Sequence, residues 1–278
     1  MKLHVINTGN FKLDGGAMFG VVPKTIWSKT NPPDQNNMCS WAMRCLLIED
    51  GNKKILIDTG IGNKQSEKFF QYFYLHGKDN LLQSLMNINI SPEEITDVFF
   101  THLHFDHCGG AIIKHNGKYD LMFKNAIHLT NKKHWELANN PNGREKASFL
   151  KENFLLIKEK NKLRFIPEGK LYPNILVKFF HGHTAAQMIP LIKFKNQTIV
   201  FMADLLPSIG HIPLPYIMGY DTQPLVTLKE KQIFFQEAVE KKYILFLEHD
   251  YHYECCTVMN TDKGIRVDKY GKLKDFLI

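Results

Sequence analysis

Three histidines and one aspartate lie within six consecutive residues, just after a short apolar run: His102, His104, Asp106 and His107. Imidazole and carboxylate groups suit zinc, and also manganese, iron or cobalt. In an extended segment, His102 and His104 point to the same side, whereas on a helix they would diverge by roughly 200°. If the chain turns at Phe105, Asp106 and His107 face a second ion beside the first. A purely structural loop does not require these residue types at this spacing, so the motif predicts a metal site.

Other potential ligands stand where apolar runs of the sequence end. Taken singly, an aspartate before Thr-Gly is usually a turn former or helix cap, and a lone histidine at a strand end is usually only hydrogen-bonded. However, functional side chains of sheet proteins gather at one edge, where the loops converge. We therefore expect several of these residues to join the site: Asp58, His181, His183, Asp204 and His249.

The elements that must position these side chains alternate between strands and helices. Apolar runs rich in β-branched and aromatic residues predict strands at 45–48, 54–57, 98–100, 175–180, 189–194, 198–202 and 243–247. Helical spacing of apolar residues predicts helices at 66–75, 80–86, 132–138, 144–158 and 228–239. Ser91, Pro92 and two following glutamates have the pattern of a short helix start. This alternation is typical of an α/β protein.

The composition of the chain indicates a globular protein. Its 278 residues are 44% hydrophobic and 23% charged, which excludes disorder and fibrous repeats, and α/β proteins of this length commonly form one domain. We therefore expect a single domain over 1–278. No run approaches the roughly 18 apolar residues of a membrane helix, and the start of the chain is too polar for a signal peptide. Five cysteines without CxxC spacing favour reduced thiols, so a cytoplasmic protein without a membrane partner is expected.

The net charge of +7 does not by itself indicate a nucleic-acid partner. Lysines and arginines are scattered, and glutamates interrupt the mild crowding of lysines at 151–170, as on an ordinary solvated helix face. We therefore expect no nucleic acid as partner.

The segment from Thr101 to Gly110 resembles the HxHxDH signature of the metallo-β-lactamase-fold hydrolases. The order of the remaining candidate ligands along the chain is similar to that of the family's motifs. The resemblance covers most of the chain and implies an αββα sandwich, with two mixed sheets and helices on the outer faces. Residues 14–20 and 204–224 most resemble the branch that contains quorum-quenching lactonases and methyl parathion hydrolase.

The resemblance implies a role for each candidate ligand. His102, His104 and His183 would hold one divalent ion, Asp106, His107 and His249 would hold the second, Asp204 would bridge both, and Asp58 would orient a ligand from beneath. Zinc is the expected metal, with manganese, iron or cobalt as alternatives. The family often has Gly-His-Thr-Pro-Gly-His around the fourth histidine, whereas this chain has Gly-His-Thr-Ala-Ala-Gln at 182–187. His183 is therefore the expected ligand, and His181 is the alternative.

Two ions about 3.5–4 Å apart can share a water and lower its pKa from 15.7 toward about 7. The expected nucleophile is thus a bridging hydroxide that attacks a lactone, a carboxylic ester or a phosphotriester. Asp106 and Asp204 are the expected catalytic residues, because Asp106 can hydrogen-bond the hydroxide and later pass a proton to the leaving group.

Candidate substrate contacts lie on predicted loops, where apolar side chains either meet a ligand or pack as a lid on the core. They indicate a small, apolar, ester-like substrate: Met18, Phe19, Phe105, Tyr216 and Tyr220. Related lactonases carry a substrate-contacting tyrosine soon after the bridging aspartate. Here Leu-Leu-Pro follows Asp204, which leaves Tyr216 or Tyr220 to take that place.

Other functions remain open at this point. A phosphodiesterase or nuclease of the same fold would suit the net charge of +7, and di-iron or mononuclear iron enzymes share the fold. A metal-binding module without turnover is the non-enzymatic alternative. The apolar segment 11–27, expected to be a loop, would cover either its own site or that of the partner subunit in a homodimer.

Overall fold

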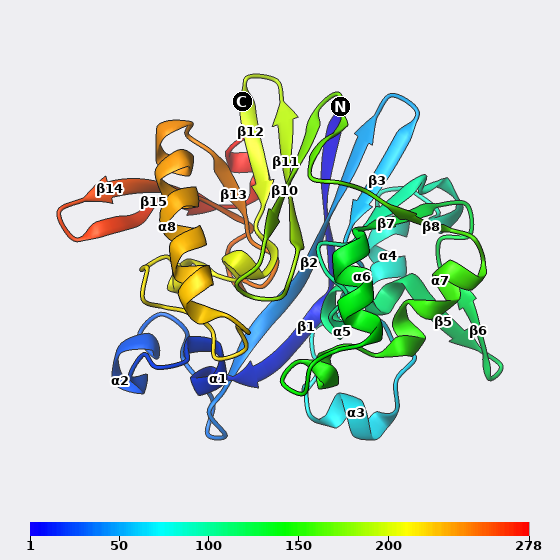
Figure 1. Cartoon of the computed structure of the whole chain (residues 1–278), viewed down its shortest axis with the longest axis horizontal. Coiled ribbons are helices and arrows are strands. Elements are labelled where there is room, and N and C mark those ends of the chain that lie inside the picture. Colours follow the sequence, from blue (N-terminus) through cyan, green and yellow to red (C-terminus); the bar gives the residue numbers. More distant parts are fainter. Residues whose placement is uncertain (278) are drawn as a thin grey trace. The chain divides into compact units, whose positions relative to one another are not determined.

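The computed structural model describes residues 1–277, and the chain divides into two compact units (Figure 1). Unit 1 contains Met1–Phe11 and Met43–Pro167, and unit 2 contains Lys12–Ala42 and the chain from Glu168 onward. Each unit combines a sheet with helices, so the chain is an α/β protein as predicted. None of the helices formed by residues 1–277 is both long enough and apolar enough to cross a membrane. The single-domain expectation stays a prediction.

The main sheet of unit 1 is mixed. Its strand order is β1 (Lys2–Asp14), β2 (Met38–Asp50), β3 (Lys53–Ile57), β4 (Asp97–Phe99), β7 (Ile127–Thr130) and β8 (Leu163–Phe165). The first two strands continue into unit 2. A tight turn joins β2 to β3 in an antiparallel pair, whereas β3, β4, β7 and β8 run parallel. The carboxyl ends of the parallel strands therefore lie at one edge, where the loops that follow β3 and β4 can present side chains together.

Short helices and a hairpin complete unit 1. The apolar faces of its sheet and helices form one buried core that includes Leu47, Val98, Phe100, Trp135 and Phe154. The helices are α3 (Glu67–Gln71), α4 (Leu81–Met86), α5 (Phe105–Cys108), α6 (Lys132–Asn139) and α7 (Leu155–Glu159). The hairpin pairs β5 (Ile112–His115) with β6 (Lys118–Leu121), and 3₁₀ turns occur at Pro92–Glu94, Gly109–Ala111, Lys146–Ser148 and Lys151–Asn153.

The sheet of unit 2 has seven strands. Their order is β15 (Gly264–Gly271), β14 (Cys255–Thr261), β13 (Ile244–Phe246), β12 (Gln197–Phe201), β11 (Gln187–Phe194), β10 (Ile175–Phe180) and β9 (Gly169–Tyr172). All neighbours are antiparallel except β12 and β13, which the long helix α8 (Pro224–Glu240) connects. Unit 2 also contains α1 (Gly15–Phe19), α2 (Lys24–Trp27) and 3₁₀ turns at Ala203–Leu205, Ile209–His211 and Leu273–Asp275.

The structure confirms all seven predicted strands and corrects two of the predicted helices. The predicted helix 144–158 is wrong, because extended Phe149 and Leu150 separate the 3₁₀ turn Lys146–Ser148 from the 3₁₀ turn Lys151–Asn153, and only Leu155–Glu159 is α-helical. In this bent segment both Phe149 and Phe154 are buried. The helix predicted at 66–75 covers only Glu67–Gln71. The segment 11–27 is not a plain loop, since it contains the end of β1 followed by α1 and α2.

Candidate metal centre

In unit 1, the loop after β4 gathers three imidazole rings. His104 is extended and α5 begins at Phe105, which is the turn expected from the sequence. The ring centroid of His102 lies 4.5 Å from that of His104 and 3.9 Å from that of His107. Oδ2 of Asp106 lies 3.8 Å from Nε2 of His107. Packing gives no reason to crowd three buried imidazoles together, whereas a shared cation does.

Asp58 fixes the orientation of this loop from below. It follows the last residue of β3, has a φ of 57° and is completely buried. Its Oδ1 accepts a hydrogen bond from the backbone N–H of Thr101 (2.8 Å), and its Oδ2 accepts one from the Thr101 hydroxyl (2.6 Å). The same Oδ2 lies 3.1 Å from Nδ1 of His107. The Nδ1–H of His107 therefore donates to Asp58, which leaves Nε2 as the ligand atom.

His102 is oriented through Thr101. Its Nδ1 lies 3.1 Å from the Thr101 oxygen, whose proton goes to Asp58. The Thr101 oxygen thus accepts from Nδ1–H of His102, and Nε2 of His102 keeps its lone pair. One carboxylate sets the ring tautomers of two candidate ligands, directly for His107 and through Thr101 for His102.

The turn after His107 is packed too closely for larger residues. A Cβ on Gly109 would lie 2.1 Å from the carbonyl oxygen of Ile61. Buried Lys64 donates to the carbonyl of Gly109, and burial lowers the pKa of that lysine to about 8. Burial raises the pKa of the neighbouring Cys108 thiol to about 12, so this cysteine is a packed thiol rather than a nucleophile at neutral pH.

Two side chains that the sequence interpretation did not identify contact His104. Oε2 of buried Glu145 lies 3.7 Å from Nε2 of His104, and the ring of Phe149 packs on the same imidazole at 4.8 Å. A third residue, His134 of α6, accepts a hydrogen bond from the backbone N–H of Leu103 (2.8 Å). Glu145 lies in the stretch that the sequence assigned to a helix, so its position beside His104 had no sequence signal.

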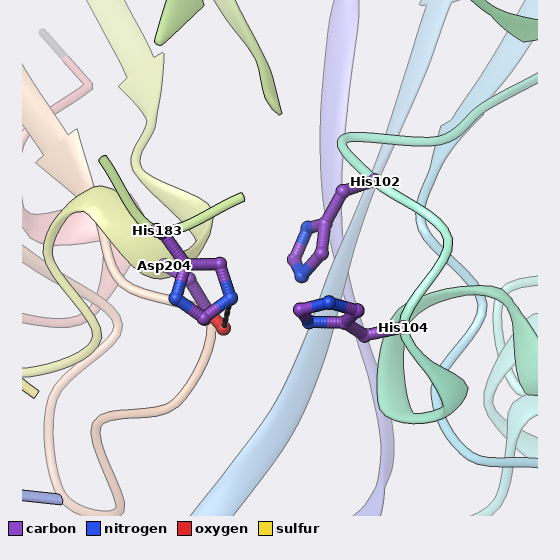
Figure 2. A group of neighbouring side chains, drawn as sticks. All are labelled: His102, His104, His183 and Asp204. Carbon is purple, nitrogen blue, oxygen red and sulfur yellow. Dashed lines mark ion pairs between the residues drawn. The ribbon is translucent and has the colours of Figure 1, made fainter. Parts of the chain in front are cut away.

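In unit 2, Asp204 lies between two histidines. Its Oδ2 is 3.0 Å from Nε2 of His183, and its Oδ1 is 3.0 Å from Nε2 of His249. Figure 2 shows the His183–Asp204 ion pair, together with the side chains of His102 and His104 from unit 1. A carboxylate that offers one oxygen beside each of two imidazoles has the geometry of a bridging ligand.

The outer nitrogens of both unit 2 histidines are occupied. Nδ1 of His249 lies 2.8 Å from the carbonyl oxygen of Ala42, and Nδ1 of His183 lies 2.9 Å from Oδ1 of Asp221. Both Nδ1–H groups therefore donate, and both Nε2 atoms face Asp204. Burial alone would lower the pKa of His183, but Asp204 and Asp221 outweigh it and raise that pKa to about 10. This half of the site thus has an excess of negative charge that favours a cation.

The structure places His181 and His183 in different roles. Nδ1 of His181 accepts a hydrogen bond from the backbone N–H of Ala186 (3.1 Å), so its ring closes the turn. The backbone N–H groups of His181 and Gly182 donate to Glu230 of α8, which anchors the segment. The ring of His183, by contrast, lies beside the Asp204 carboxylate. These placements favour His183 over His181 as the ligand.

The candidate substrate residues lie in two places. In unit 1, partly exposed Phe105 packs edge-on against Phe69 of α3 (5.4 Å) and at 4.7 Å against Phe73, which follows α3. In unit 2, Met18 and Phe19 are buried, Tyr216 is partly buried, and Tyr220 is exposed. The Phe19 ring stacks on His211 and Trp27. A substrate contact at any of the five residues predicted from the sequence stays a prediction.

The donor set of each unit fits a metal ion. Unit 1 offers His102, His104, Asp106 and His107, and unit 2 offers His183, Asp204 and His249. Imidazole nitrogens and carboxylate oxygens are ligands for zinc, manganese, iron and cobalt, and all seven side chains are buried. Groups that accept hydrogen bonds from the imidazole Nδ1–H atoms lie beyond the ligands, as they do in known metal sites: Asp58, Thr101, Asp221 and the carbonyl of Ala42.

The chain is similar to several known proteins. The model of the metallo-β-lactamase superfamily matches residues 44–235. A crystal structure of a "probable metal-dependent hydrolase" from Staphylococcus aureus is 31% identical, with 97% of this chain and 96% of that chain covered and a TM-score of 0.88. The dizinc quorum-quenching lactonase AidC is 22% identical, with 96% and 93% covered and a TM-score of 0.79. The N-acyl homoserine lactonase of Bacillus cereus is 24% identical over 268 residues, which cover 91% of this chain and 94% of the lactonase.

Proposed function

Because the chain belongs to the metallo-β-lactamase superfamily, we propose that it is a metal-dependent hydrolase that cleaves ester bonds, lactones first among them. The superfamily and the α/β fold class agree with the sequence prediction. The observation that carries the proposal is the position of Asp204, with one carboxylate oxygen 3.0 Å from Nε2 of His183 and the other 3.0 Å from Nε2 of His249. This arrangement supports a bridging role between two ions.

We propose that the two ligand sets together hold two divalent ions. His102, His104 and His183 would hold one, Asp106, His107 and His249 the other, and Asp204 both. Zinc is the proposed metal, supported by the dizinc lactonase to which the fold is similar, and manganese, iron or cobalt would suit the same ligands. When bound, such a pair supplies an activated water at neutral pH and polarises the bond to be cleaved.

The protein's own residues would perform the remaining steps. We propose that Asp106 accepts a hydrogen bond from the attacking water, orients it, takes up its proton during the attack, and then passes that proton to the leaving oxygen. Asp58 holds His107 directly and His102 through Thr101, so the ligand rings stay aligned during turnover. No serine or cysteine nucleophile is required, in agreement with the packed state of Cys108.

The aromatic cluster beside α5 supports an apolar acyl group in the substrate. Phe69, Phe73 and Phe105 are partly exposed and pack on one another, and Phe105 lies between His104 and Asp106 in the sequence. Partly exposed aromatic rings beside polar groups are typical of small-molecule sites. The curated relatives that match over most of the chain are named N-acyl homoserine lactonases. We therefore propose a lactone with an apolar acyl chain, and we assign its polar contact to Tyr216 or Tyr220.

The proposed setting is the cytoplasm, because five cysteines without CxxC spacing favour reduced thiols. We further propose that the two units act as one hydrolase domain, because the matched region 44–235 includes parts of both. We also propose a homodimer in which segment 11–27 covers the site of the partner subunit.

The test is a proton-release assay on zinc-loaded and manganese-loaded protein, with His102→Ala as the inactive control. The substrates are an acyl homoserine lactone, an aryl ester, a phosphotriester and a phosphodiester, and metal content is measured on the same samples. We expect lactone turnover that disappears in the variant, with close to two ions per chain. Turnover of the phosphodiester alone would replace the proposal with a nuclease-type activity, and two bound ions without any turnover would leave a binding module.

A further inference from the structure

The segment Leu205–Asp221 of unit 2, called here the tyrosine loop because it carries Tyr216 and Tyr220, is tied at both ends to candidate metal ligands. Its first residue follows Asp204 directly in the sequence. Its last residue, Asp221, is buried and lies 2.9 Å from Nδ1 of His183. Next along the chain, the backbone N–H of Thr222 donates to the carbonyl of His183 (3.0 Å). A change in the orientation of His183 therefore alters the hydrogen bonds that hold the end of this loop.

Lys231 of α8 clamps the middle of the tyrosine loop. Its side chain is buried, and its Nζ donates to the carbonyl of His211 (2.6 Å) and to that of Tyr216 (2.9 Å). Burial of an ammonium group is costly unless it is hydrogen-bonded or paired, so a lysine at this position is not explained by packing alone. Its two hydrogen bonds fix the backbone at His211 and at Tyr216, which flank residues 212–215.

A further set of contacts holds the loop against α1. His211 stacks on Phe19 with ring centroids 4.3 Å apart, and its Nε2–H donates to the carbonyl of Met18 (2.9 Å). The backbone N–H of Gly219 donates to the carbonyl of Ala17 (2.8 Å). These contacts place the tyrosine loop in one position, and the hydrogen bond between Asp221 and His183 connects that position to a candidate metal ligand.

We infer that Asp221 is a positioning residue that couples cation binding at His183 to the order of the tyrosine loop. The inference rests on the proposed function, because it requires a divalent cation at Nε2 of His183. A cation at that atom fixes the imidazole plane, and the fixed Nδ1–H then holds the Asp221 carboxylate and the end of the loop. By linkage, a loop that is held in place presents His183 in the binding orientation and strengthens cation binding. Substrate contacts from Tyr216 or Tyr220 thus depend on metal occupancy.

The experiment combines zinc affinity with hydrogen exchange. Zinc binding is measured by competition with a chromophoric chelator, and deuterium uptake of peptides covering 205–221 is followed with and without zinc. The variants are Asp221→Ala, which removes the acceptor, and Asp221→Asn, which keeps an acceptor oxygen without the charge. Asp268→Asn is the matched control, since Asp268 lies exposed on β15 and bonds only Thr257 among the contacts described.

We expect zinc to slow exchange of 205–221 in the wild type and in Asp268→Asn. Asp221→Ala is expected to weaken zinc binding about tenfold or more and to abolish the zinc-dependent protection, as for other partners of metal-bound histidines. Asp221→Asn should lie between the two, which keeps the test valid if the alanine variant folds poorly. Lys231→Met should raise exchange of the loop at every zinc concentration and, by the same linkage, should weaken zinc binding less than Asp221→Ala does.

The outcomes distinguish a failure of the proposed coupling from a failure of the proposed function. Wild-type affinity together with wild-type protection in Asp221→Ala and Asp221→Asn would overturn the coupling and leave the hydrolase proposal standing. A wild-type protein that binds no zinc or manganese would instead overturn the proposed function, and the coupling with it. Protection that zinc confers equally on 205–221 and on a distant segment such as β15 would show global stabilisation, and the coupling would again be wrong.

Discussion

Nδ1 of His107 lies 3.1 Å from Oδ2 of Asp58, and both side chains are completely buried. The same carboxylate accepts two hydrogen bonds from Thr101. A buried carboxylate is stable only where donors satisfy it, and here every donor comes from the loop that carries the candidate ligands. Asp58 therefore links the end of β3 to the geometry of the site.

Replacement of Asp58 should weaken metal binding more than it destabilises the fold. We expect Asp58→Ala to lower zinc affinity about 10–100-fold, because His107 and His102 lose the acceptor that sets their tautomers. Asp58→Asn tolerates the positive φ and should lose less. Zinc affinity by chelator competition, beside urea unfolding of the metal-free proteins, separates the two effects. Asp120→Asn at the exposed hairpin is the control, and equal zinc affinity in all four proteins would contradict the prediction.

Asp204 should be indispensable for a second ion. Asp204→Asn keeps the volume of the side chain and one oxygen acceptor, but it removes the charge that faces His183 and His249. We expect metal content to fall below two per chain and hydrolysis to fall by more than about 100-fold, a loss beyond that of a residue that only supports a ligand. Metal analysis after gel filtration and the proton-release assay check both parts. Near-normal turnover with one ion or fewer would rule out the dinuclear mechanism.

A side chain on Gly182 should disturb the segment that carries His183. A Cβ there would lie 2.2 Å from Oγ1 and 2.3 Å from the backbone nitrogen of Thr227 on α8. Because this backbone cannot move without α8, Gly182→Ala is expected to cost about 1–3 kcal/mol in the free energy of unfolding and to weaken zinc binding. Gly143→Ala is the matched control, since a Cβ on Gly143 would meet no other atom within 4 Å. Urea unfolding of both variants measures the difference in the free energy of unfolding. Equal stability would show that α8 shifts to accommodate the added methyl group.

Much of the fold follows from patterns that are local in the sequence. The runs that became β3, β4, β12 and β13 are short, rich in β-branched and aromatic residues, and bounded by turn residues, and this composition identified them as strands. Strand β1 was missed because its thirteen residues are mostly partly buried and its apolar and polar side chains do not alternate regularly. The helix expected at 144–158 failed because long-range burial of Phe149 and Phe154 outweighed helical spacing.

The candidate ligands were recognisable because few structural roles require three histidines and an aspartate at such close spacing. Their supporting residues were not, apart from Asp58. Asp221 and Glu145 each stand beside a histidine that is distant in the sequence, with a separation of 38 residues in the case of Asp221 and His183. A single acidic residue in a loop has no local pattern, so its partner depends on tertiary packing. Sequence reasoning therefore reaches the candidate metal ligands and Asp58, but it does not reach Asp221 and Glu145.

His128 of β7 should make unit 1 sensitive to acid. Its imidazole is completely buried and stacks on Phe100, and burial lowers its pKa from 6.5 to about 4. Below pH 6.5 the unfolded chain therefore takes up a proton that the folded chain does not, so stability falls with pH until about pH 4. Above pH 6.5 this histidine is neutral in both states and contributes no pH dependence. At pH 5 the loss attributable to His128 is expected to be about 2 kcal/mol, since each pKa unit corresponds to about 1.4 kcal/mol.

The measurement compares the free energy of unfolding at pH 7 and pH 5 for metal-free wild type and His128→Leu. The metal-free state keeps the titration of the candidate ligands the same in both proteins. We expect the wild type to lose about 2 kcal/mol more than the variant between these pH values. His115→Gln, which changes an exposed histidine of the β5–β6 hairpin, should keep the wild-type slope. If His128→Leu keeps that slope as well, His128 is protonated in the folded protein at pH 5, and water or a polar neighbour must reach its ring.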